Sequence, residues 1–176
     1  MPVLILARHA KAEAEGPTDF ERSLNPKGLA QAIEAGAEIA ERWSPDVAIA
    51  SAARRTVQTG QAVVEAVNRV TGDDSDAGAD ADADSVGGLE LRQDASLYQG
   101  GVEDWLDAIN SIPAESDCAY IVGHQPTVAE VVGHLSPATG VPEEFRPSSI
   151  AVFDLESWNV EPGDYPAPEI RVFRGV

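Results

Sequence analysis

The sequence predicts an α/β fold, a three-layer α/β/α sandwich with a mainly parallel central sheet. Short, unbroken apolar runs alternate along the chain with longer segments whose apolar residues recur every three or four positions, which is the pattern of strands alternating with helices. An unbroken apolar run is typical of a strand that helices cover on both faces. Hydrophobic residues make up 43% of the chain, enough for a core, and 176 residues suit one domain spanning residues 1–176.

The first two strands and helices are expected in the order βαβα. Residues 3–7 form the first apolar run and predict a central strand. Pro26 suits the first position of a helix, which we expect to end near Trp43, and residues 47–50 predict the second strand. A second helix should cover residues 54–70. The apolar sides of these helices are expected to carry Leu29, Ile33, Ala37 and Ala40 in the first and Val57, Val64 and Val67 in the second.

An acidic segment follows the second helix. From about residue 71 to residue 88 the composition changes to Asp, Ala, Gly and Ser, which predicts a flexible loop. Within it, Asp80, Asp82 and Asp84 suggest a calcium loop. An EF-hand loop counted from Asp80 needs glycine where Ser85 stands and glutamate where Leu91 stands, so calcium binding is not predicted.

The alternation of strands and helices continues through the second half of the chain. The spacing of apolar residues predicts strands at 89–91, 119–122, 150–155 and 170–173, and helices at 102–110 and 126–135. Strands that alternate with helices in this way favour a mainly parallel sheet, whose binding sites lie at the carboxyl ends of the strands.

Charge and composition exclude several classes of partner. The chain has 12 Lys and Arg against 30 Asp and Glu, a net charge of −18, which repels phosphate backbones and anionic lipids. We therefore expect neither a nucleic acid nor a membrane as partner. The acidic, lysine-poor composition resembles that of proteins from salt-adapted, halophilic organisms. The single cysteine, Cys118, cannot form an internal disulfide and fits a reducing cytoplasmic compartment.

Basic and imidazole side chains follow three of the predicted strands. Arg8 and His9 come directly after the first strand, Arg54 and Arg55 just beyond the second, and His124 directly after the fourth. Because parallel strands end at one edge of a sheet, these side chains should meet there. A single arginine in such a place is usually half of a surface ion pair, but together these groups predict a phosphoryl site, since guanidinium groups bind phosphoryl oxygens and neutral imidazole is a nucleophile.

Five stretches of the chain share their order and spacing with one known family. They are residues 6–11 (LARHAK), 19–28 (DFERSLNPKG), 51–59 (SAARRTVQT), 97–98 (LY) and 122–126 (VGHQP). In combination they resemble the histidine phosphatase superfamily, also called phosphoglycerate mutase-like, and within it the compact SixA-type branch of phosphohistidine phosphatases. The resemblance runs from Val3 to about Phe153. Ala52 and Thr56 depart from the proline and alanine of the family pattern at peripheral positions.

The resemblance implies a role for each of the basic residues. His9 would be the nucleophile that accepts the phosphoryl group, with Arg8 and Arg55 as the arginines that bind its oxygens during catalysis. Arg22 would be a further phosphate ligand. His124 would bind and stabilise the transferring phosphoryl group. The arginines supply the positive charge that the phosphoryl oxygens need, so we expect no metal and no cofactor.

The leaving group poses a separate question. Hydrolysis of an alkyl ester normally needs a general acid, and Asp94 and Glu103 lie in the right part of the chain to be possible proton donors. In so acidic a sequence the favoured interpretation of either is a solvated surface residue, so no proton donor is assigned. Phosphohistidine needs less help, because imidazole has an unperturbed pKa of about 6.5 and leaves readily.

The favoured interpretation is thus a metal-independent phosphatase, most simply a phosphohistidine protein phosphatase. The alternatives are a small-molecule phosphomonoesterase or mutase of the same superfamily, and a phosphate-dependent binding module without turnover. A metal hydrolase built on the two histidines would lack nearby ligands at helical spacing. The substrate is expected to be a phosphorylated protein or a small phosphorylated metabolite, and the sequence carries no indication of oligomeric state.

Overall fold

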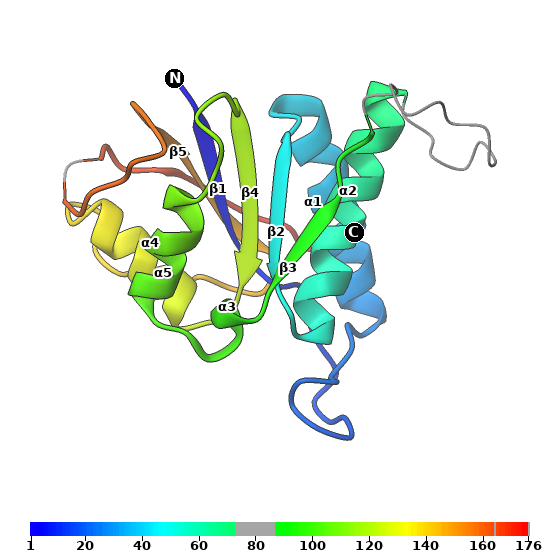
Figure 1. The fold of residues 1–176 in the computed structure, drawn as a ribbon. Helices are drawn as coiled ribbons and strands as arrows, with labels where there is room; N and C mark the ends of the chain where they lie inside the picture. The colour runs from blue at the N-terminus through cyan, green and yellow to red at the C-terminus, as the bar shows by residue number, and fades with distance from the viewer. Residues whose placement is uncertain (73–86, 164, 176) are drawn as a thin grey trace.

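Strands and helices alternate through most of the chain (Figure 1). The computed structural model describes residues 1–72, 87–163 and 165–175. The strands are β1 (Val3–Arg8), β2 (Val47–Ser51), β3 (Leu91–Asp94), β4 (Cys118–Gly123), β5 (Ser149–Asp154) and β6 (Glu169–Val172). The helices are α1 (Pro26–Arg42), α2 (Arg54–Thr71), α3 (Ser96–Gln99), α4 (Val102–Asn110) and α5 (Thr127–Leu135).

The strands form one sheet in the order β3-β2-β4-β1-β5-β6. β1 pairs parallel with β4, β4 with β2, and β2 with β3, whereas β5 runs antiparallel to both β1 and β6. The sheet is therefore mainly parallel, as predicted. Every residue of β4 is buried, which is what an unbroken apolar run at the centre of a covered sheet requires.

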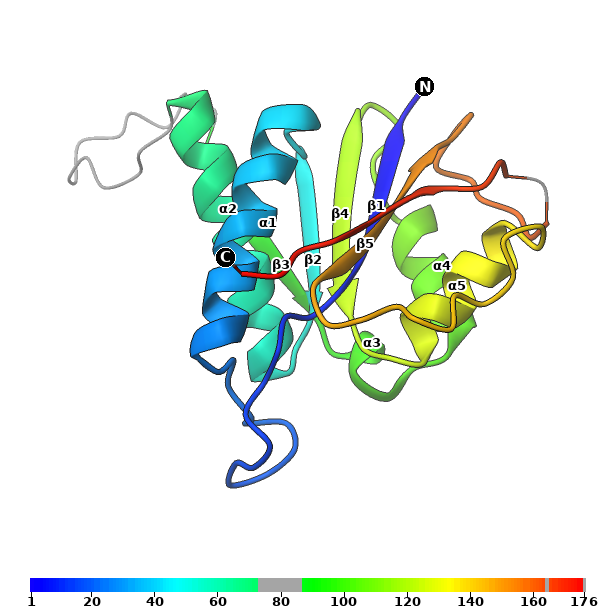
Figure 2. The ribbon, with the colours of Figure 1, turned by 180° about the vertical axis from the view of Figure 1, so that it is seen from behind.

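Helices cover both faces of this sheet. Figures 1 and 2 show α1 and α2 on one face and α4 and α5 on the other. One apolar cluster includes Trp105, Ile109 and Val128 from α4 and α5, and a second includes Ile39 and Val63 from α1 and α2. The two cores on opposite faces confirm the three-layer α/β/α sandwich. Among the described helices, none combines the length and apolar character that a membrane span requires.

The buried side of α1 differs from the prediction. Leu29 and Ile33 are 46% and 67% exposed, and Ala37 is exposed as well. The buried residues are instead mostly small: Gly28, Gln31, Ala32, Ala35, Gly36, Ile39 and Ala40. The cause is the close approach of α1 to α2, since a Cβ atom on Gly36 would lie 2.7 Å from the backbone oxygen of Ala62. Small residues of α1 face the neighbouring helix here. The small size of these side chains therefore determined which side of α1 is buried, and the prediction from large apolar residues was wrong.

The strand expected at 89–91 lies further along the chain, at Leu91–Asp94. The backbone groups of Leu89 bond to the side chain of Asn68, N–H to Oδ1 at 2.8 Å and C=O to Nδ2 at 3.0 Å. These groups are thereby unavailable to the sheet, which delays the start of β3. The acidic loop expected at about 71–88, with its Asp80–Asp84 series, lies almost entirely outside the described residues.

Candidate active site

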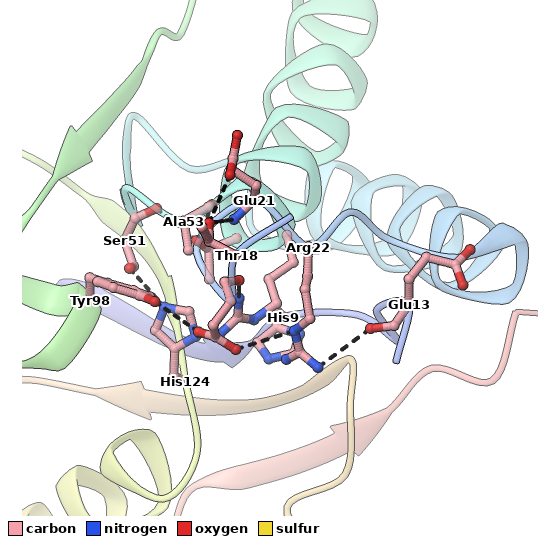
Figure 3. Close-up of polar contacts among 12 residues, drawn as sticks. His9, Glu13, Thr18, Glu21, Arg22, Ser51, Ala53, Tyr98 and His124 are labelled. Carbon is pink, nitrogen blue, oxygen red and sulfur yellow. Dashed lines mark hydrogen bonds and ion pairs between the residues drawn. The ribbon is translucent and has the colours of Figure 1, made fainter. Parts of the chain in front are cut away.

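Three of the side chains that were predicted to meet at one sheet edge, His9, His124 and Arg55, lie together there (Figure 3). His9 follows β1, His124 follows β4, and their ring centroids are 5.5 Å apart. Arg55, in the first turn of α2, places Nη2 3.2 Å from Nδ1 of His124. The strand ends are in register, because Arg8 pairs with Gly123. Glycine is needed at position 123, since a Cβ atom there would overlap the ring of Trp105.

His9 is held as a neutral imidazole with one nitrogen free. Its Nδ1 lies 2.7 Å from the backbone oxygen of Ala10. A carbonyl oxygen can only accept, so Nδ1 carries the hydrogen and Nε2 keeps its lone pair. The pKa of His9 is lowered to about 3, and burial is the main cause. The electrostatic effects of His124, Arg55 and Arg8 lower it further, whereas the hydrogen bond to Ala10 raises it. The ring is therefore unprotonated and nucleophilic at neutral pH.

His124 is oriented through both ring nitrogens. The guanidinium of Arg55 can only donate, so Nδ1 of His124 is the acceptor of that hydrogen bond. The hydrogen of the His124 ring is therefore on Nε2, which donates to Oγ of Ser51 at 2.8 Å. Burial, followed by the charge of Arg55, lowers the pKa of His124 to about 4. Ser51 at the end of β2 and Arg55 at the start of α2 thus fix a neutral second imidazole beside His9.

Arg8 and Arg55 bring partly unsatisfied guanidinium groups to the site. Arg8 donates from Nη1 to the backbone oxygen of Phe145 at 2.9 Å, and burial lowers its pKa. Arg55 is only 5% exposed. The Nε atoms of both arginines are buried and have no hydrogen-bond partner among the described residues. Unpaired buried donors are costly, and an oxyanion is the partner that such a group of cations would accept.

Asp19 and Tyr98 complete the site, and sequence reasoning assigned neither a role. Oδ2 of Asp19 accepts from the Tyr98 hydroxyl at 2.8 Å and from Nη2 of Arg55 at 3.2 Å, while Oδ1 lies 3.2 Å from Nε of Arg22. The hydrogen bond from Tyr98 lowers the pKa of Asp19, and the charges of Arg55 and Arg22 lower it further. Desolvation raises this pKa but does not cancel the other effects. The Tyr98 ring packs edge-on against His124, with 5.6 Å between centroids. Both residues lie within the stretches that resemble the family, and this position was the feature of the sequence that could have identified them.

The two candidate proton donors do not join this cluster. Asp94 ends β3, and its Oδ1 accepts from the backbone N–H of Ser96 at 3.0 Å and from the Ser96 hydroxyl at 2.6 Å. Its carboxylate therefore orders the start of α3. Glu103 lies exposed in the first turn of α4. Arg54, next to the buried Arg55, is exposed.

No cluster of three or more His, Cys, Asp and Glu side chains arranged to hold a metal ion occurs among residues 1–72, 87–163 and 165–175. The side chains at the sheet edge are cationic arginines and neutral imidazoles from separate elements. Their arrangement is suited to an anion, and above all to a phosphoryl group that guanidinium groups can surround.

This fold and this site define a phosphatase of the histidine-dependent kind. The family model for the histidine phosphatase superfamily (branch 1) matches residues 4–116, and the chain belongs to that superfamily.

The solved structures to which this chain is similar include members of the SixA-type branch. A structure from Agrobacterium tumefaciens, provisionally assigned as the phosphohistidine phosphatase SixA, is 28% identical with a TM-score of 0.70, over 96% of this chain and 99% of that one. A provisionally assigned SixA from Nakamurella multipartita is 25% identical with a TM-score of 0.65, over 95% of this chain and 96% of that one. The protein histidine phosphatase SixA complexed with tungstate shares the fold, with a TM-score of 0.69 at 19% identity over 94% and 96%. No curated protein matches the chain.

Proposed function

We propose that this protein is a metal-independent phosphohistidine protein phosphatase that works through a phosphohistidine on His9. The observation that carries the proposal is the state of His9: Nδ1 is tied to the Ala10 carbonyl oxygen at 2.7 Å, the pKa is lowered to about 3, and Nε2 keeps a free lone pair. A neutral imidazole beside arginine side chains is a competent nucleophile toward phosphorus. The likeness to SixA-type structures supports the same assignment.

The reaction follows in two displacements. In the first, Nε2 of His9 forms a bond to phosphorus while the bond between phosphorus and the leaving group breaks, and the leaving group departs with the electron pair. In the second, water attacks phosphorus, the bond to Nε2 breaks, and inorganic phosphate leaves with His9 neutral again. Arg8, Arg55 and Arg22 neutralise the equatorial oxygens in both steps.

His124 is held beside the proposed nucleophile through both ring nitrogens. Its Nδ1 accepts from Arg55 and its Nε2 donates to Ser51, so the imidazole and the Arg55 guanidinium are directly bonded. We infer that this pair stabilises the transferring phosphoryl group, with the imidazole turning toward a phosphoryl oxygen when substrate displaces one of its partners.

The chemistry of the leaving group favours a phosphorylated histidine. Among the described carboxylates, Asp19 is the one that contacts the site arginines, and its pKa is lowered by Tyr98 and by those arginines. An ionised carboxylate cannot donate a proton to a departing alkoxide. Imidazole, with an ordinary pKa of about 6.5, leaves without such a donor. This is the reason to prefer a phosphorylated protein over a small alkyl phosphate as substrate.

A comparison of three substrates tests the proposal. We expect kcat/KM to decrease in the order phosphohistidine protein, aryl phosphate, sugar phosphate. His9→Ala should abolish turnover, whereas His134→Ala, a matched histidine change in the last turn of α5, should retain it. Wild-type protein denatured in alkaline detergent during turnover should carry a phosphoryl group that acid removes.

Each alternative predicts a different result. Preference for the sugar phosphate, lost in Asp94→Asn or Glu103→Gln, would assign the chain to small-molecule phosphatases. Binding of phosphoprotein without turnover in the wild type would leave only a binding module.

A further inference from the structure

We propose that a pocket lined by Lys11, Lys27, Arg146 and Arg174 binds acidic side chains that flank the phosphorylated residue of a protein substrate. The pocket has a volume of about 540 Å³ and lies outside the cluster of His9, Arg55 and His124. The inference rests on the proposed phosphatase function and adds a substrate preference to it.

The charge of this pocket is opposite to that of the chain as a whole. The protein carries 30 acidic residues against 12 Lys and Arg, yet four cations and a single acid, Glu144, line the pocket. Lys11 and Lys27 are the only lysines of the sequence, and both are here. A local cationic site on a strongly anionic protein concentrates anionic ligands that the rest of the surface repels.

Most of these cations lack an internal partner. Glu144 pairs with Arg146 at 3.0 Å. In the part of the chain that the structure describes, Lys11, Lys27 and Arg174 make no ion pair. Lys27 also lies in the first turn of α1, which carries no acidic residue, so the amino end of the helix adds to the positive potential. Three cations are thus available to an anionic ligand.

Two segments of the chain contribute residues both to the pocket and to the surroundings of the phosphoryl site. Lys11 lies two residues beyond His9, and its N–H donates to Oε1 of Gln31, another lining residue, at 3.0 Å. The backbone oxygen of Phe145, which lies between the lining residues Glu144 and Arg146, accepts from Nη1 of Arg8 at 2.9 Å. A substrate whose phosphoryl group lies against Arg8 and His9 can therefore place neighbouring residues in the pocket.

The shape of the pocket favours a protein flank as its occupant. Pro147, Val172 and Phe173 contribute apolar surface beside the cations, and a volume of this order accommodates a few side chains. Apolar surface beside cations suits the stems and carboxylates of Glu and Asp. A small phosphorylated metabolite with a second anionic group is the competing occupant.

Two phosphohistidine peptides of equal length test the inference, one with Glu and Asp on both sides of the phosphorylated residue and one with Gln and Asn. We expect the double variant Lys27→Gln/Arg174→Gln to raise KM for the acidic peptide about 10-fold at low salt, the scale of losing two exposed charge contacts. The value of kcat should be unchanged, and KM for the neutral peptide should stay within about twofold. In 1 M KCl the difference between the peptides should largely vanish.

The matched control is Arg69→Gln/Arg92→Gln, which removes the same charge from two exposed positions that do not line this pocket. It should leave KM for both peptides within about twofold. Equal effects of the two double variants, or equal KM values for the two peptides in the wild type, would overturn the inference while the phosphatase function stands. A small phosphorylated carboxylate that depends on Lys27 and Arg174 more than the acidic peptide does would overturn the choice of a protein flank.

Binding of the unphosphorylated acidic peptide, followed by fluorescence anisotropy, separates the pocket from the chemistry. If the wild type hydrolyses neither phosphopeptide, the proposed function fails. The pocket inference then stands only if the acidic peptide binds the wild type several-fold more tightly than it binds Lys27→Gln/Arg174→Gln, and equal affinities overturn it.

Discussion

Arg55 donates two hydrogen bonds to Asp19, one from Nη1 to the backbone oxygen at 2.7 Å and one from Nη2 to Oδ2 at 3.2 Å. The same carboxylate lies 3.2 Å from Nε of Arg22. Asp19 therefore orients two of the proposed phosphate ligands and places a negative charge close to where a phosphoryl group would bind. These two effects act on the reaction in opposite directions, because one organises the arginines and the other competes with the substrate for them.

Asp19→Asn separates the two effects of this carboxylate. The amide keeps the size of the side chain but removes its charge, so Arg55 and Arg22 are held less firmly and are more available to anions. We expect kcat to fall about 10-fold, within the range for disturbing a preorganised charge-stabilising group, while inorganic phosphate inhibits more strongly. Steady-state kinetics with phosphate as inhibitor measure both. Glu21→Gln is the control, since Glu21 bonds to Thr18, and weaker inhibition by phosphate in Asp19→Asn would refute the competition.

The neighbouring arginines 54 and 55 provide a second test. Arg55 is buried and bonded to His124 and Asp19, whereas Arg54 is exposed. We expect Arg55→Ala to lower kcat/KM by about 10²-fold or more, the scale of losing one charge-stabilising donor. Arg54→Ala should change it by no more than a few-fold. Greater damage at Arg54 than at Arg55 in the same assay would show that the wrong guanidinium has been assigned to the phosphoryl group.

The location of the candidate site could be predicted from the sequence largely because most of its residues follow strand ends. An apolar run marks where a parallel strand stops, and the side chains that come next meet at one edge whatever the details of packing. The contact of Asp19 with Tyr98 joins residues 79 positions apart, so only the folded chain reveals it. Ala40 is buried as predicted, but most of the buried face of α1 was missed. Gly36 lies close to the backbone of α2, and a search for large apolar residues passes over such a position.

The net charge of −18 leads to a prediction about salt. Repulsion between carboxylates destabilises the compact state, and salt screens it, because the Debye length falls from about 10 Å at 0.1 M to about 3 Å at 1 M. We expect Tm to rise by several degrees between 0.1 and 1 M KCl and to change little above that. Calorimetry at pH 7 measures the rise. A Tm that is constant or falls over this range would contradict the salt-adapted interpretation of the composition.

The lowered pKa values of His9 and His124, about 3 and about 4, predict how stability depends on pH. In the unfolded chain both imidazoles have an ordinary pKa of about 6.5. Between pH 6.5 and pH 4 the unfolded state therefore binds more protons than the folded state, and acidification favours unfolding. The stabilising contribution is complete above pH 6.5 and is lost as the pH falls through this window, by up to about 1.4 kcal/mol per pH unit for each histidine.

The variant His9→Asn isolates this effect from the titration of the many carboxylates, which wild type and variant share. Denaturant unfolding of both proteins at several pH values gives the difference in their free energies of unfolding. We expect the wild type to lose stability relative to the variant as the pH falls from 6.5 to 4.5, because asparagine has no proton to gain in the unfolded chain. A difference that stays constant over this range would mean that the folded protein protonates His9 as readily as the unfolded chain does. The imidazole would then not be held neutral for attack on phosphorus at mildly acidic pH.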